Sequence, residues 1–174
     1  MSEYKPGDVI FTREQIEARA VEIGRQITAD YEGREIVLVG ILTGCVMWLS
    51  ELMKSIKLDM VVDFISVSSY GSSTRSSGIV KINKDLNNAI RDRHVLIVED
   101  IVDSGVTLDY LYHFLQGRDP ASIKICAMVD KPSGRRIDME ADYVGFVAPP
   151  VFLIGYGLDA DQRYRNLPYI AALE

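Results

Sequence analysis

The sequence predicts an α/β protein in which helices flank a mostly parallel sheet, and two observations carry that prediction. Apolar runs over residues 36–41 and 95–98, and a run over 123–129 that only Lys124 interrupts, are typical of strands buried on both faces of a sheet. Segments with helical periodicity separate these runs, which is the pattern of a parallel sheet with right-handed crossovers. The chain has 174 residues, enough for one sizeable core, so we expect 1–174 to form a single domain.

The first helix is expected to begin at Thr12, because Thr12 and Gln15 have the spacing of a capping box. Apolar residues then recur at helical spacing and predict one buried face, made of Ile16, Ala20, Ile23 and Ile27. Gly33 ends this segment, and the apolar run at 36–41 follows as a buried strand.

A short turn at Thr43 and Gly44 leads into a second helix, with four residues expected to face inward, Leu49, Leu52, Met53 and Ile56. Residues 60–67 and 79–84 have the composition of two strands joined as a long hairpin. Between them, residues 68–78 are dominated by serine and glycine and cannot bury their own surface. We therefore expect a loop that stays mobile unless a ligand orders it.

The central strand is expected at 95–99, followed by a helix over 105–116 that ends at Gly117. The buried face of that helix would be made of Leu108, Leu111 and Leu115. A further buried strand follows at 123–129, and the chain closes with short strands at 143–147 and 151–156 and a polar segment at 159–168.

Composition excludes several classes of function. The net charge is −6 and the isoelectric point about 5.0, so no overall basic field would attract nucleic acid. The apolar runs are too short to cross a bilayer, and the N-terminus lacks a basic segment followed by an apolar one. We expect a cytoplasmic protein without membrane or nucleic-acid partners.

Several residue types that often carry chemistry are expected to be structural. Cys45 and Cys126 lie far apart in apolar surroundings, which predicts two buried thiols in a reducing compartment. His94 and His113 lack the spacing of a metal site, and Trp48 belongs to the buried side of its helix.

The segment 95–108, VLIVEDIVDSGVTL, carries the most informative chemistry. A buried strand ends in Glu99 and Asp100, a third carboxylate follows at Asp103, and a small polar loop then opens a helix. A helix N-terminus offers unpaired N–H groups to a phosphate, and carboxylates suit a divalent cation or sugar hydroxyls. The predicted ligand therefore carries a phosphate and a polyol in one molecule.

Other polar residues stand at strand ends, where ligands bind in open α/β sheets. Thr43 and Gly44 follow one strand, Lys131 follows another, and Phe152 and Asp159 lie near the end of the chain. The parallel sheet predicts that these ends meet at one edge.

Segment 95–108 also resembles the phosphoribosyl-diphosphate (PRPP) signature of type I phosphoribosyltransferases. The chain as a whole resembles the hypoxanthine-guanine phosphoribosyltransferase family, because further motifs occur in family order: LTGC, SSYGSSTRSSG, VDKPSGRR and DYVGFVAPPVFLIGYGLDADQRYRNLPYI. The resemblance implies a parallel-sheet type I fold with a flexible hairpin loop at about 68–78. It also implies a small hood subdomain, built from the N-terminus and about 143–174.

The resemblance assigns a role to each matching residue. PRPP and its 5′-phosphate would be bound by Glu99, Asp100, Asp103, Ser104, Gly105, Val106 and Thr107, with Asp103 also acting as the catalytic acid or base at N7 of the purine. The purine would be bound by Lys131, Phe152, Leu153 and Asp159. Pyrophosphate would be bound by Thr43, Gly44 and Arg165, Mg²⁺ would be held by Glu99, Asp100 and Asp159, and Ser69 and Tyr70 would close over the site.

The implied reaction is Mg²⁺-dependent transfer of phosphoribose from PRPP to hypoxanthine or guanine, giving IMP or GMP and pyrophosphate. The family implies a homodimer or homotetramer. Thr43 departs from the family pattern, which commonly has Lys or Arg there, and this removes a cation from the pyrophosphate side. Pro149 and Pro150 stand where an acidic residue is more usual, and we have no account of that difference.

Other readings stay open at this point. The same chemistry could act on xanthine or another base, and a PRPP-binding regulator or a nucleotide-binding module could keep the loop without catalysis. Taken alone, Lys131 is a surface lysine, Phe152 a core residue, and Asp159 with Arg165 a surface ion pair of little worth.

Overall fold

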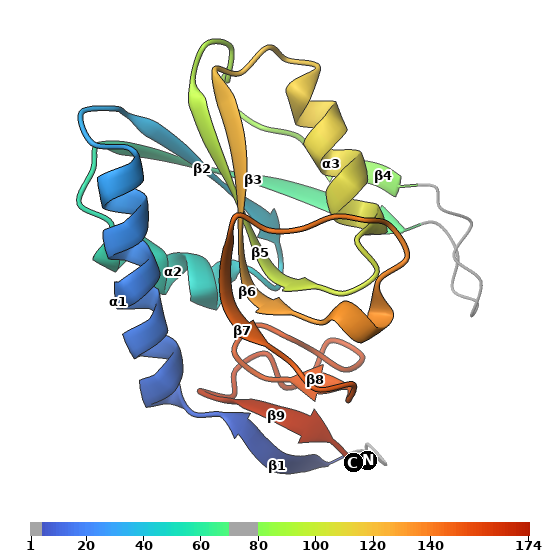
Figure 1. Cartoon of the computed structure of the whole chain (residues 1–174). Helices are drawn as coiled ribbons and strands as arrows, with labels where there is room; N and C mark the ends of the chain where they lie inside the picture. Colours follow the sequence, from blue (N-terminus) through green and yellow to red (C-terminus); the bar gives the residue numbers. More distant parts are fainter. Residues whose placement is uncertain (1–4, 70–79) are drawn as a thin grey trace.

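A six-stranded sheet forms the centre of the computed structural model, which describes residues 5–69 and 80–174 (Figure 1). Across the sheet the strands are β4 (Val80–Lys84), β3 (Met60–Ser69), β2 (Ile36–Leu42), β5 (His94–Val102), β6 (Ser122–Asp130) and β7 (Tyr143–Val147). All neighbouring pairs are parallel except β3 with β4, which form an antiparallel pair at one edge. The predicted α/β class is confirmed.

Helices cover both faces of this sheet. Helices α1 (Arg13–Asp30) and α2 (Val46–Ser55) pack on one face, and α3 (Val106–Gln116) packs on the other (Figure 1). Each face has its own buried apolar cluster, one containing Trp48 of α2 and the other Leu111 of α3. The sheet is therefore buried on both sides, as its continuous apolar strands predict.

The predicted start of α1 is confirmed in detail. The Thr12 hydroxyl accepts a hydrogen bond from the Gln15 N–H at 3.3 Å, and the Gln15 side chain accepts one from the Thr12 N–H at 2.8 Å. The four residues expected to form its inner face are all buried. The helix ends at Asp30, and Gly33 then takes a φ of +71°, a conformation that favours glycine.

Helix α2 contains one wrong expectation. Leu49, Leu52 and Ile56 are buried as predicted, but Met53 is 39% exposed. Trp48 and Leu52 lie one turn apart at the middle of the buried face, which leaves Met53 at its edge. Trp48 is fully buried, as its packing role requires.

A second, smaller sheet forms the hood below the main one (Figure 1). It consists of β1 (Pro6–Phe11), β9 (Ile170–Leu173) and β8 (Leu153–Ile154), with β9 in the middle and antiparallel to both neighbours. The strand expected at 151–156 is thus much shorter, and no strand was predicted at β1 or β9, although both lie in the segments expected to form the hood. β7 at 143–147, which was assigned to the hood, belongs to the main sheet instead. β1 pairs with β9 across almost the whole chain, so no local pattern predicts that pairing.

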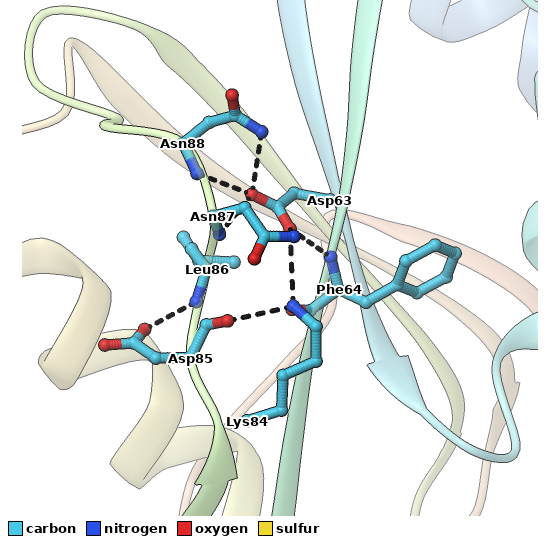
Figure 2. A network of polar contacts seen from close by, with 7 residues as sticks. All are labelled: Asp63, Phe64, Lys84, Asp85, Leu86, Asn87 and Asn88. Atoms are coloured by element: carbon cyan, nitrogen blue, oxygen red, sulfur yellow. Dashed lines mark hydrogen bonds and ion pairs between the residues drawn. The ribbon is translucent and has the colours of Figure 1, made fainter.

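Asp63 on β3 anchors the segment that leads from β4 to β5 (Figure 2). Its side chain is 2% exposed, and the two oxygens accept five hydrogen bonds, from the N–H groups of Phe64, Asn87 and Asn88 and from both asparagine amides. Lys84 Nζ lies 3.7 Å from Oδ1 and donates to the carbonyl of Phe64. These donors lower the pKa of Asp63 although burial acts against them.

Within the described residues, no helix combines the length and the apolar character needed to cross a membrane. Cys45 and Cys126 are buried free thiols, as expected. His94 Nδ1 lies 2.8 Å from the Ser122 hydroxyl, on the strand next to its own, and His113 lies 3.4 Å from Asp109 on the outer side of α3.

Candidate active site

The carboxyl ends of β2, β5 and β6 meet at one edge of the sheet, where the chain order of the strands reverses direction. From β2 the chain runs outward through β3, whereas from β5 it runs the other way through β6. Ligands bind at such a switch point in open α/β sheets. Two adjoining cavities of about 310 and 170 Å³ lie there, and both are lined by Asp100, Asp103 and Asp159.

The larger cavity brings together most of the residues expected to bind PRPP and pyrophosphate. Those lining it include Thr43, Gly44, Glu99, Asp100, Asp103, Ser104, Gly105, Thr107, Asp159 and Arg165. Val106 does not line the cavity but begins α3 beside it. Val67 of β3 and Leu108 of α3 also line the wall and were missed, because nothing in their sequence distinguishes them from core residues.

The phosphate loop is shaped by Gly105. This residue caps the N-terminus of α3 with a φ of +82°, which any side chain would strain. The Val106 N–H donates to the Ser104 hydroxyl at 3.4 Å, and the helix opens toward the cavity. The first turn of an eleven-residue helix thus presents N–H groups and its positive dipole end to the cavity.

The acidic pair lies within the last part of β5, which continues to Val102 and does not end at residue 99 as expected, and it is held in a low-polarity setting. Burial, and after it the charge of Asp100, raise the pKa of Glu99 well above its usual value. Glu99 Oε2 is buried without a hydrogen-bond partner among the described residues. Burial also raises the pKa of Asp100, although the Ile101 N–H, which donates to Oδ1 at 2.7 Å, and the charge of Arg165 act against it.

The turn after β2 lies directly against this pair. A Cβ on Gly44 would lie 1.5 Å from Asp100 Oδ2, so only glycine leaves the carboxylate where it is. The peptide bond between Leu42 and Thr43 is cis. On its other side the turn contacts the loop between β8 and β9, since a Cβ on Gly157 of that loop would lie 2.0 Å from the Gly44 carbonyl oxygen.

Arg165 and Asp159 form an ion pair of 2.8 Å at the rim of the larger cavity. Arg165 also donates to the Gly157 carbonyl at 2.7 Å and to the Gln162 side chain at 3.2 Å. Each side chain is 25% exposed, so the two groups form a half-buried contact at the cavity and not a fully solvated surface pair.

The smaller cavity has a partly apolar lining that suits an aromatic base. Lys131 lies with only 16% of its side chain exposed, and its Nζ is 3.7 Å from Asp103 Oδ2. Phe152 is 56% exposed at the opening, so its reading as a core residue is wrong. Leu153 lines the cavity as expected, and Leu158, immediately before Asp159, was missed.

Two expected site residues fall at the limit of the described chain. Ser69 is the last residue of β3, and Tyr70 lies outside the described residues, as does most of the loop expected at 68–78. Their closing role stays a prediction.

Comparison with known proteins agrees with this geometry. The family model of the phosphoribosyl transferase domain matches residues 8–161. The hypoxanthine-guanine phosphoribosyltransferase of Bacillus subtilis is 46% identical over 95% of this chain and 92% of its own length. The bifunctional protein TilS/HprT of Listeria innocua is 49% identical, but the chain spans only about a quarter (26%) of that protein.

Solved structures show the same fold. A hypoxanthine phosphoribosyltransferase from Staphylococcus aureus superposes with a TM-score of 0.94 at 45% identity, covering 97% of this chain and 92% of that one. A hypoxanthine-guanine phosphoribosyltransferase from Bacillus anthracis superposes at 0.92 with 39% identity, covering 99% of this chain and 100% of that one. The matched family model, the close relatives and the shared fold together show that the chain belongs to the phosphoribosyltransferase family.

Proposed function

We propose that this protein transfers phosphoribose from PRPP to hypoxanthine and guanine, giving IMP or GMP and pyrophosphate. The observation that supports this most is the pair of adjoining cavities that share Asp103. One of them combines a helix N-terminus with carboxylates, which suits a phosphorylated sugar, and the other offers Phe152 and Lys131 to a flat base. A glycosidic bond would form where the two cavities meet.

The phosphorylated ribose would be bound between the last residues of β5 and the start of α3. The 5′-phosphate would accept hydrogen bonds from the loop formed by Ser104, Gly105, Val106 and Thr107, which lies at the positive end of α3. Glu99 and Asp100 would accept hydrogen bonds from the ribose hydroxyls.

The pyrophosphate side combines the turn after β2 with Arg165. Backbone groups of Thr43 and Gly44 and the Arg165 guanidinium would hold the leaving pyrophosphate. Four carboxylates and one arginine line this cavity, so a polyanionic substrate needs further positive charge.

Magnesium fits that requirement. Glu99, Asp100 and Asp159 are hard oxygen donors, and the partnerless Glu99 oxygen is available to a cation or its water. No three of the His, Cys, Asp or Glu residues that the structure describes are arranged to hold a metal ion by themselves, so substrate oxygens would complete the coordination. When bound, Mg²⁺ would neutralise charge that develops on the leaving pyrophosphate.

On the base side, Phe152 would stack on the purine, the Leu153 backbone would contact its edge, and Lys131 would donate to the oxygen at C6. A 6-aminopurine would place a donor against the lysine, which disfavours adenine. As N9 bonds to C1 of the ribose and the bond from C1 to pyrophosphate breaks, Asp103 would accept the proton from N7.

The test measures nucleotide formation from PRPP in the presence of Mg²⁺, with hypoxanthine, guanine, xanthine and adenine in separate assays. We expect nucleotide formation with hypoxanthine and guanine and its loss on chelation of the metal. Turnover with xanthine alone would move the proposal to another base, and binding of PRPP without turnover would favour a regulator. Asp103→Asn is expected to lower kcat by roughly 10²- to 10⁴-fold if Asp103 moves the proton.

We also propose assembly into a homodimer or homotetramer. Val46 and Met53 expose apolar surface on α2, beside Leu49 and Phe64. Trp48 of the same helix is fully buried and does not contribute to this surface. Light scattering on the purified protein would give the oligomeric state, and a monomer at micromolar concentration would refute this assignment.

A further inference from the structure

The segment after β6 is attached by its backbone to the phosphate loop after β5. The Lys131 N–H donates to the Val102 carbonyl at 2.9 Å. The N–H groups of Arg136 and Ile137 both donate to the Ser104 carbonyl, at 2.9 and 3.2 Å. Any shift of residues 131–137 therefore reaches the phosphate loop, and Lys131 moves with it.

Two glycines allow residues 131–137 to contact Asp103 and the phosphate loop. A Cβ on Gly134 would lie 1.5 Å from Asp103 Oδ1, so the carboxylate rests directly against the turn. A Cβ on Gly105 would lie 3.2 Å from the Ile137 carbonyl oxygen and 3.6 Å from Arg135 Cδ. Arg135 thus lies next to the phosphate loop and is not among the residues that line the larger cavity.

Arg135 closes the turn that carries Lys131. Its Nη2 pairs with Oδ1 of Asp130, the last residue of β6, and its side chain is only 18% exposed. The pair joins the two ends of a short segment whose middle is the 3₁₀ turn η1 (Pro132–Gly134). A mostly buried, charge-assisted contact of this kind is screened little by salt and restricts motion at both ends.

The ion pair of Arg135 with Asp130 leaves one nitrogen of the arginine unsatisfied within the described part of the chain, which is unfavourable for stability. Arg135 Nη1 is buried without a partner among the described residues. A buried donor left unpaired is unfavourable, and buried ion pairs are often no better for stability than apolar side chains of similar size. The place of the pair, across the turn that carries Lys131 and beside the phosphate loop, is therefore more informative than its contribution to stability.

We propose that Arg135 is a positioning residue for base recognition: through Asp130 and Gly105 it fixes the turn that holds Lys131 3.7 Å from Asp103. The inference rests on the proposed function, in which these two side chains face one purine. If the turn becomes mobile, Lys131 is no longer held in one direction toward C6 of the purine. The affinity for the base then falls more than the affinity for PRPP. Selection against a 6-amino group weakens for the same reason.

The test compares Arg135→Met with Arg136→Met. Methionine keeps the aliphatic length of Arg135 but removes its charge, and Arg136 is the neighbouring arginine with an exposed side chain. We expect Arg135→Met to raise KM for hypoxanthine by roughly 10- to 100-fold, to leave KM for PRPP within about 3-fold, and to lower the hypoxanthine-to-adenine ratio of kcat/KM. Arg136→Met is expected to leave all three unchanged.

Two further variants separate positioning from folding. Asp130→Asn is expected to reproduce the effect of Arg135→Met, and the double variant to be no worse than either, since both remove one contact. Arg135→Lys keeps the charge and should restore part of the base affinity even if Arg135→Met folds poorly.

Three outcomes would overturn the inference: equal effects of the two arginine variants, a larger rise in KM for PRPP than for hypoxanthine, or additive effects of Asp130→Asn and Arg135→Met. A wild-type protein without turnover on hypoxanthine would instead refute the proposed function itself.

Discussion

Replacing Asp63 by asparagine tests whether one buried carboxylate holds the edge of the sheet. Asparagine has the same shape, but one of its two acceptor oxygens becomes an NH₂ group. If that group faces the Oδ1 side, it meets the Phe64 N–H and the Asn87 amide, which now lie 2.8 and 3.3 Å from the oxygen. On the Oδ2 side it meets three donors at 2.8 to 3.0 Å. In either orientation the new NH₂ group of the asparagine faces hydrogen-bond donors that have no acceptor there.

The size of the effect follows from those contacts. At least one buried backbone N–H loses its acceptor, which costs about 1–3 kcal/mol, and the remaining bonds lose the charge that strengthens them. We expect Asp63→Asn to lower the free energy of unfolding by about 3 kcal/mol. For a chain of this length that corresponds to a fall in Tm of roughly 6–12 °C.

Urea unfolding at pH 7 measures this, with Asp59→Asn as the matched control, because Asp59 is exposed immediately before the same strand. The control is expected to stay within about 0.5 kcal/mol of wild type. Since the pKa of Asp63 is lowered below its ordinary value of 3.8, its contribution is present above that value and lost as pH falls through the folded-state pKa. Equal stability of the two variants at pH 7 would refute the reasoning.

Three further predictions concern the site and the core. Gly44→Ala places a Cβ 1.5 Å from Asp100 Oδ2 and is expected to lower kcat/KM by roughly 100-fold, whereas unchanged kinetics would show that the carboxylate can move freely. The pKa of Glu99 is raised in the folded protein. Its contribution to the free energy of unfolding is therefore fully present below pH 4.5, the ordinary pKa of a glutamate, and is lost as the pH rises through the raised pKa. Glu99→Gln should therefore raise the Tm of the ligand-free protein at pH 8 but not at pH 4 in calorimetry, and equal shifts at both would contradict this. Burial raises the pKa of Cys126 to about 12 and also raises that of Cys45, so neither should react with Ellman's reagent until urea unfolds the protein.

The sequence alone determined the main sheet and the chemistry at its edge. The strand at 36–41 is apolar throughout and the one at 123–129 is apolar except for Lys124, because both faces of a parallel sheet are covered. That pattern needs no tertiary information. The carboxylates at 99, 100 and 103 and the loop at 104–107 are contiguous, so their relation to one phosphorylated ligand is local. Sequence motifs also identified Lys131 and Phe152 correctly as neighbours of that site.

Only the tertiary structure decided which distant residues touch. The hood sheet joins β1 to β9 across the whole length of the chain, and pairing at that separation leaves no local pattern. Asp63, Gly44 and Arg135 gain their roles from atoms that approach them from other elements, while in sequence each is an ordinary aspartate, glycine or arginine. Periodicity and motifs report which surface a residue faces, whereas positioning depends on distances between elements that only packing sets.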